Sequence, residues 1–128
     1  MSNYLSHFEV FGEGPENLAV FYSEVLGWQI EKMEGLDYWR IQVKLPAETL
    51  NGGLTHKYIP HLNGWLMYMN VESSDSTIEK IVNHGGAVVR PKTAVPKSGW
   101  VTIVKDPSGN MFGLWETDPL AFPMPEPD

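Results

Sequence analysis

The chain has 128 residues, of which 42% are hydrophobic and 20% charged, with a net charge of −7 and no cysteine. A chain of this length is expected to form one domain, with a hydrophobic core large enough to be stable without a structural metal or disulfide bonds. The missing cysteines exclude a thiol nucleophile and a zinc–thiolate site. Basic residues stand singly, and binding to a phosphate backbone needs clustered cations, so nucleic acid is excluded as a partner.

The N-terminus has no basic segment followed by an apolar run, and no stretch approaches the roughly 18 apolar residues of a membrane helix. We therefore predict a cytoplasmic protein with no membrane partner.

The first half predicts a strand, a helix and further strands. The strand covers residues 5–11. Gly14-Pro15 starts the helix, with proline at the first helical position, and Gly27 stops it. Residues 38–44 alternate between apolar and polar side chains, which indicates a half-buried strand. Asn51-Gly52 predicts a tight turn with Gly52-Gly53 as turn formers, and residues 46–50 and 56–63 are predicted loops.

The pattern restarts at about Gly64. A strand is predicted over 65–71 and a helix over 77–84, opened by Ser76 with Glu79 as a capping box and stopped at Gly85-Gly86. A tight turn over residues 106–110 separates later strands. The tail from Asp118 is acidic and proline-rich, and we predict that it is loosely attached.

A repeat of about sixty residues with one helix in each copy predicts two modules that pack on one another. We expect a single domain over 1–128, with modules over about 3–56 and 64–117 and a tail over 118–128. The predicted class is α+β, with a curved mixed sheet around a cleft and helices on its outer face.

Alternation divides the strand residues between two faces. The predicted helix-facing set is Phe8, Val10, Trp39, Ile41, Met67, Met69, Val101, Ile103, Phe112 and Leu114. The predicted cleft-facing set is His7, Glu9, Tyr38, Arg40, Gln42, Leu66, Tyr68, Asn70, Trp100, Thr102, Met111, Gly113 and Trp115. Aromatic rings mixed with a few polar groups are typical of a small-molecule pocket.

Within this set, His7 and Glu9 are the candidate catalytic pair, because imidazole titrates near neutrality and a carboxylate can hold and polarise the ring. The alternative for His7 is a hydrogen bond across the sheet. Arg40 could clamp an anion, or pair with an acid at the surface. The candidate ligand-binding residues are Tyr38, Arg40, Gln42, Tyr68, Asn70, Trp100, Thr102 and Trp115. The tryptophans could stack on a ligand or simply fill space.

Three stretches resemble the vicinal oxygen chelate superfamily, which includes glyoxalases, extradiol dioxygenases and bleomycin-resistance proteins. They are residues 7–10 leading to Phe21-Tyr22 and 26–28, residues 65–71, and the turn 106–110 before the last strand. The resemblance covers about residues 4–116. It implies paired βαβββ modules, a small-molecule ligand and a homodimer.

The resemblance also implies metal ligands on the first and last strands of each module. His7 falls on one such position, whereas the other three hold Gly53, Leu66 and Gly113. Glu116 lies three residues beyond Gly113, so alternation points it away from the cleft. One ligand in four predicts no resident cofactor, because a catalytic metal needs about three protein ligands. A divalent metal completed by Glu9, His56 or His61 is the alternative.

Two functions follow from these residues and the resemblance. The first is a protein that binds a small molecule in an aromatic cleft without the full metal site. The second is a glyoxalase- or lyase-type enzyme in which His7 and Glu9 transfer protons, with or without a metal. A lyase, isomerase or dioxygenase-like activity would fit the superfamily.

Overall fold

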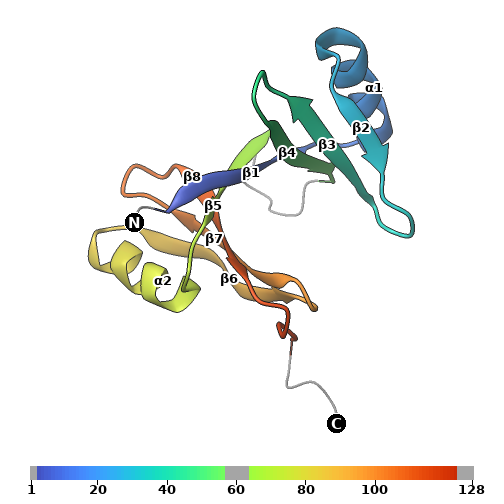
Figure 1. Cartoon of the computed structure of the whole chain (residues 1–128). Helices are drawn as coiled ribbons and strands as arrows, with labels where there is room; N and C mark the ends of the chain where they lie inside the picture. Colours follow the sequence, from blue (N-terminus) through green and yellow to red (C-terminus); the bar gives the residue numbers. More distant parts are fainter. Residues whose placement is uncertain (1–2, 57–63, 124–128) are drawn as a thin grey trace. The chain divides into compact units, whose positions relative to one another are not determined.

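The computed structural model describes residues 3–56 and 64–123. Its elements in chain order are β1 (Tyr4–Phe11), α1 (Pro15–Leu26), β2 (Gln29–Lys32), β3 (Tyr38–Lys44), β4 (Thr49–Thr55), β5 (Trp65–Asn70), α2 (Ser74–Asn83), β6 (Ala87–Val95), β7 (Gly99–Lys105) and β8 (Met111–Thr117) (Figure 1). The chain divides into two compact units. The first unit is Ser6–Met67, and the second is Met1–Leu5 with Tyr68–Asp128.

Each unit carries one helix and the same pattern of strand pairing. The strand order is β2-β3-β4-β1 in the first unit and β5-β8-β7-β6 in the second. In both units the strand before the helix pairs in parallel with the last strand, while the remaining pairs are antiparallel. The predicted α+β class, the mixed sheet and the two βαβββ modules are therefore confirmed. The cleft shared between the modules stays a prediction.

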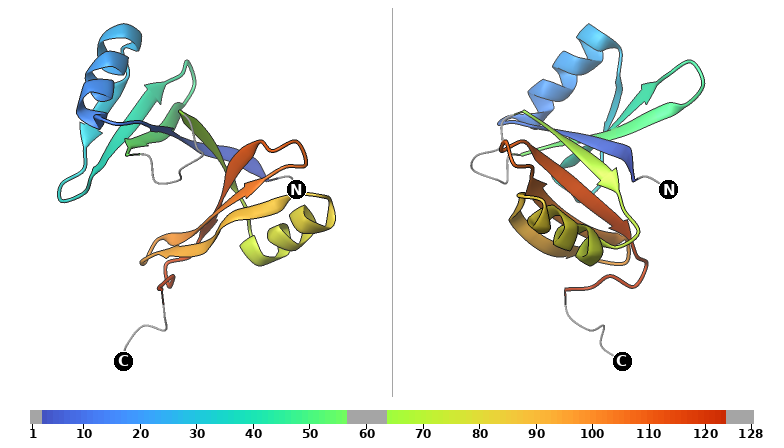
Figure 2. Two further views of the ribbon diagram at one scale, coloured as in Figure 1. Left: turned by 180° about the vertical axis from the view of Figure 1, so that it is seen from behind. Right: turned by 90° about the vertical axis from the view of Figure 1, so that its left-hand side faces the viewer.

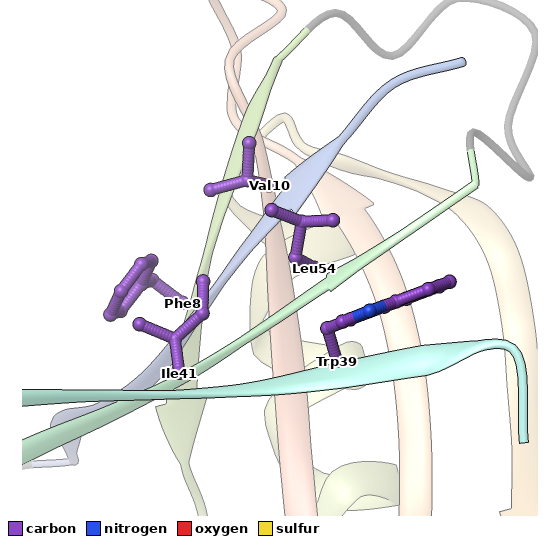
Figure 3. Packing of buried hydrophobic residues seen from close by; sticks show 5 residues of the cluster. All are labelled: Phe8, Val10, Trp39, Ile41 and Leu54. Atoms are coloured by element: carbon purple, nitrogen blue, oxygen red, sulfur yellow. The ribbon is translucent and has the colours of Figure 1, made fainter. Parts of the chain in front are cut away.

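The first unit closes its core between α1 and one face of its strands. Pro15 begins the helix, and Gly14 and Gly27 flank it with positive φ angles of 71° and 72°, as its glycine signals predicted. The buried side chains gather over β1, β3 and β4 in Figure 3, and they are Phe8, Val10, Trp39, Ile41 and Leu54. Because these residues alternate along their strands, the opposite face carries their polar neighbours.

The predicted tight turn at Asn51-Gly52 is wrong. Asn51, Gly52 and Gly53 lie inside a strand and form no turn. A Cβ on Gly52 would stand 2.5 Å from the Phe8 ring, so this glycine lets the ring approach the strand closely. The Asn-Gly pair is typical of turns, but glycine serves equally well where another group approaches the backbone closely.

In the second unit α2 packs beside β6, as both views of Figure 2 show. The helix begins at Ser74 rather than Thr77, and its N-cap is Ser73, whose hydroxyl accepts a hydrogen bond from the backbone N–H of Ser76 at 3.1 Å. The predicted capping box at Ser76 is therefore wrong. Ser73 and Ser74 precede Ser76, and serine is a favoured N-cap residue at any of these positions. The sequence alone therefore does not show which serine caps the helix.

The face assignment of β7 is also wrong. Val104 packs with Leu114 in the core under α2, and Thr102 lies directly opposite Leu114 in the strand register. Alternation then places Trp100 with Thr102 on the helix side, and Val101 and Ile103 on the other side. The side chains on both faces of β7 are apolar enough to be buried. The alternation of residues along this strand therefore did not indicate which face lies against α2.

The first residues of the tail are held to the second unit. The backbone N–H of Lys97 donates to the carbonyl of Ala121 at 2.9 Å, and Ala121 is fully buried. The Trp100 indole donates to Asp118 at 3.0 Å and, with a backbone N–H from Leu120, holds the pKa of that carboxyl below its usual range. The prediction of a loosely attached arm is wrong for this segment. Among the described residues no helix is long and apolar enough to cross a membrane.

Candidate functional site

Three polar side chains meet on the face of the first unit that lies opposite α1. The Tyr38 hydroxyl donates a hydrogen bond to Glu9 Oε2 at 2.8 Å and lies 3.0 Å from His7 Nε2. The same carboxylate oxygen is 3.9 Å from His7 Nε2. Glu9 is buried, with 9% of its surface exposed, while His7 and Tyr38 are half-buried. We call these three residues the polar cluster.

Gly53 makes room for this cluster. The strand register places Glu9 of β1 and Arg40 of β3 on either side of Gly53 of β4, so the three residues form one row across the sheet. A Cβ on Gly53 would overlap the hydroxyl and ring of Tyr38. The tyrosine therefore lies over the bare backbone of Gly53, and its hydroxyl reaches the carboxylate on the next strand.

The second unit has an equivalent row, with Tyr68 of β5, Gly113 of β8 and Ile103 of β7 in register. Here too a tyrosine fills the space at the central glycine, because a Cβ on Gly113 would overlap the Tyr68 ring. Tyr68 and Ile103 are buried. The row in the first unit thus carries a carboxylate and a guanidinium, whereas the row in the second unit is packed with an aromatic ring and an aliphatic side chain.

Arg40 and Gln42 lie on the same face of β3 as Tyr38. Arg40 is exposed and stands 3.9 Å from Glu31 of β2. Arg40 and Gln42 also line an open hollow of about 510 Å³ at the edge of the first unit. The rest of its lining is Gln29 and Glu31 together with Ser23 of α1, Trp28 and Ile30. The predicted site residues of the first module therefore lie on one face, and the hollow lies at the β2 edge, where it is lined from that face and from α1.

The predicted ligand-binding residues of the second module lie on two faces. Tyr68 and Asn70 lie opposite Gly113 and Trp115 in the strand register, on the face away from α2. Trp100 and Thr102 lie on the α2 face, where Lys92 stands 4.7 Å above the Trp100 ring. These two residues are therefore separated from Tyr68, Asn70 and Trp115 by the sheet of the second unit.

The positions that the resemblance assigns to a metal do not suit one. Besides His7, they hold Leu66, which is 1% exposed, and the two glycines whose side-chain space the tyrosines fill. Glu116 faces α2, where its carboxylate accepts the backbone N–H of Ser74 at 2.6 Å. His56 pairs with Asp37 at 2.7 Å, and His61 lies outside the described residues. Within the described part of the chain, no three His, Asp or Glu side chains gather as a metal site.

The sequence did not reveal that Tyr38 joins His7 to Glu9. The sequence predicts Tyr38 as a ligand-binding residue of the cleft, and Gly53 as a turn former at a position where the family has a metal ligand. One sequence signal for the close approach of Tyr38 was available. The pair Gly52-Gly53 is followed by Leu54 and Thr55, which continue the same strand. Glycine in a strand interior indicates that another group comes close to the backbone there.

Two βαβββ units in one chain are a fold of the glyoxalase class, and the family comparison makes the assignment specific. Residues 10–115 match the family model described as a glyoxalase-like domain. The chain belongs to this family.

Relatives and solved structures agree with the assignment. The chain is 26% identical over 112 residues to CFP32 of Mycobacterium bovis, a protein that is named as a glyoxylase, and this match covers 87% of the chain but 43% of the relative. The chain thus spans less than half the length of this curated relative. Among solved structures, a glyoxalase/bleomycin resistance protein/dioxygenase superfamily member from Vibrio splendidus has a TM-score of 0.62 at 11% identity, covering 91% of this chain and 100% of that one.

A methylmalonyl-CoA epimerase from Streptomyces coelicolor, solved with 2-nitronate-propionyl-CoA, has a TM-score of 0.60 at 13% identity, covering 96% of this chain and 100% of that one. At these identities the structural matches establish the fold, and they leave the ligand of this chain open.

Proposed function

We propose that this chain binds a small molecule against the face of the first unit that carries the polar cluster, Arg40 and Gln42, and that it does so without a metal at the four family positions. The observation that carries the proposal is the contrast between the two glycine rows. The first row combines a buried carboxylate with hydrogen-bonding partners, and ligand sites use such fixed polar groups for orientation. The second row holds a buried aromatic ring and a buried aliphatic side chain in place of the carboxylate and the guanidinium.

The space at Gly53 and Gly113 supports the metal-free part of the proposal. A carboxylate at either position would require its tyrosine to leave, and His7 by itself supplies one of the roughly three ligands that a catalytic metal needs. The homodimer and the cytoplasmic location stay predictions from the sequence, and native mass spectrometry would measure the first of them.

Chemical-shift mapping of the ¹⁵N-labelled full chain tests the binding function. A mixture of small aryl carboxylates and amides is the probe, because Arg40 and Gln42 offer a guanidinium and an amide. We expect shifts to concentrate on residues 7, 9, 38–42 and 51–53. Arg40→Ala should weaken the binding about tenfold, since a hydrogen bond to a charged group is lost. Lys44→Ala, which removes a like charge from the same face of β3, should leave it within twofold.

Two results would count against this proposal. Shifts confined to the second unit, or no shifts at all, would remove the first unit as the binding face. Addition of Zn²⁺, Ni²⁺ or Mn²⁺ is expected to leave the His7 ring resonances unchanged. A stoichiometric metal that is retained by the wild type and lost in His7→Ala would overturn the metal-free part.

A second candidate function is proton transfer at a carbon next to a carbonyl, and the polar cluster is the observation that favours it. An imidazole linked through a phenol to a buried carboxylate has the connectivity of a base with an orienting group behind it. Arg40 on the same face offers a cationic hydrogen-bond donor for the oxygen that becomes negative.

Methylmalonyl-CoA is a suitable probe for this reaction, because a structural neighbour is named as its epimerase and its C2–H lies between two carbonyl groups. In D₂O the wild type should incorporate deuterium at C2, as measured by mass spectrometry. His7→Ala should slow this incorporation by about 10²–10⁴-fold, the usual contribution of a general base. Incorporation no faster than in buffer, or equal rates in the variant, would remove the second candidate for carbon acids of this kind.

A further inference from the structure

The hollow at the β2 edge carries two opposite charges side by side. Glu31 of β2 lies directly opposite Arg40 of β3 in the strand register, and their side chains stand 3.9 Å apart. Both side chains are open to solvent, Glu31 with 81% and Arg40 with 53% of its surface exposed. An exposed ion pair of this kind stabilises a protein little, so a ligand can separate the two charges at small cost.

The polar residues beside this pair are neutral. Gln29 and Gln42 form the next cross-strand pair on the same face, two residues along each strand, and both line the hollow. Among the residues that line it, the charges are therefore those of Glu31 and Arg40, and they cancel. A ligand with a carboxylate alone would suit Arg40 but would bring a like charge up to Glu31. A ligand with an ammonium group alone would meet the reverse problem.

An indole ring forms the aromatic part of the lining. Trp28 lines the hollow with Ile30, and its ring stacks on Tyr22 of α1 with the centroids 5.3 Å apart and 15° between the planes. The Phe8 ring meets the same indole edge to face, with the centroids 5.7 Å apart. Two aromatic contacts thus hold Trp28 in place before a ligand arrives, and the ring offers a fixed apolar surface.

We propose that the hollow binds a ligand with an α-amino acid group, whose carboxylate lies on Arg40, whose ammonium group lies on Glu31 and whose side chain lies against Trp28. This inference rests on the proposed binding function and names the class of ligand. The two charges of an α-amino acid are carried by one carbon, so together they can meet two protein charges only 3.9 Å apart. The volume of about 510 Å³ is in the range of small-molecule pockets.

Chemical-shift titrations of the ¹⁵N-labelled full chain with three matched probes test this inference near neutral pH. L-Phenylalanine carries both charges, hydrocinnamate keeps the ring and the carboxylate, and phenethylamine keeps the ring and the ammonium group. We expect phenylalanine to shift residues 28–31 and 40–42 and to bind about tenfold more tightly than either other probe, because each of those lacks one charge-assisted hydrogen bond. Equal binding of phenylalanine and hydrocinnamate, or no shifts with phenylalanine, would overturn the inference.

Glu31→Gln removes the negative charge and keeps the shape of the side chain. We expect this variant to bind phenylalanine about tenfold more weakly, and to bind hydrocinnamate at least as tightly as the wild type does, since the probe no longer meets a like charge. Glu24→Gln is the matched control, because Glu24 is an exposed residue of α1 outside the lining of the hollow, and it should leave both affinities within twofold. Undiminished binding of phenylalanine to Glu31→Gln would contradict the assignment of the ammonium group.

The probes also separate this inference from the function on which it rests. If hydrocinnamate shifts the residues of the first unit and phenylalanine binds no better, the α-amino acid class is wrong and small-molecule binding stands. If neither these probes nor the aryl carboxylates and amides shift any residue of the first unit, the proposed binding function is wrong, and this inference falls with it.

Discussion

The substitution Gly113→Ala is expected to destabilise the protein by about 1–3 kcal/mol, the usual cost of forcing extra volume into a packed core. The added Cβ would overlap the ring of Tyr68, which is 5% exposed and lies opposite Gly113 in the strand register. A buried ring has few places to go, so the strain falls on the pairing of β5 with β8. Urea denaturation followed by circular dichroism measures the loss.

Lys105→Ala on the neighbouring strand is the control for Gly113→Ala. Its side chain is exposed, and the substitution should change the stability by no more than about 0.5 kcal/mol. If Gly113→Ala were as stable as this control, the Tyr68 ring would be able to move away from the added Cβ without cost. The account of how the second row is packed would then be wrong.

Gly53→Ala should destabilise the first unit by a similar amount, about 1–3 kcal/mol, and should also disconnect the polar cluster. The new Cβ would displace the Tyr38 hydroxyl and ring, so the hydrogen bonds to Glu9 and His7 would both be lost. The same denaturation experiment gives the stability. The imidazole ¹⁵N chemical shifts of His7 report the disconnection, because His7 Nε2 would lose its contact with the Tyr38 hydroxyl.

A double-mutant cycle isolates the cause of this effect. In Gly53→Ala/Tyr38→Ala the overlapping ring is absent, so the pair should cost less than the sum of the single substitutions by about 0.5–3 kcal/mol. Additive costs would mean that the alanine at 53 acts through the backbone of β4 alone. The glycine would then have no special relation to Tyr38.

Much of the fold could be predicted because its signals are local. Pro15 and Gly27 bound α1 at the residues where the structure places its ends, and the alternation of residues 38–44 gave the strand and both of its faces. The start of α2 failed by a few residues because serines at 73 and 76 are equivalent as caps by residue type. The faces of β7 failed because its side chains suit burial on either side.

The candidate site was predictable in part. The alternation placed His7, Glu9, Tyr38, Arg40 and Gln42 on one face, and the strand registers agree with this. The hydrogen bonds of Tyr38 were beyond the sequence, because they depend on pairing between strands some thirty residues apart in the chain. The role of Gly53 depends on the same register. A glycine beside an asparagine is typical of a turn until the group that approaches it is known.

The two glycine rows limit how residues could be exchanged between the halves of this chain. Both backbones leave a bare position at the centre of the row, but the ring that covers it comes from β3 in the first unit and from β5, the counterpart of β1, in the second. A graft that copied the polar residues of β1 onto β5 would replace Tyr68 and leave Gly113 uncovered. Transfer of the chemistry to the second half would require a donor segment that brings its own tyrosine from the strand corresponding to β3.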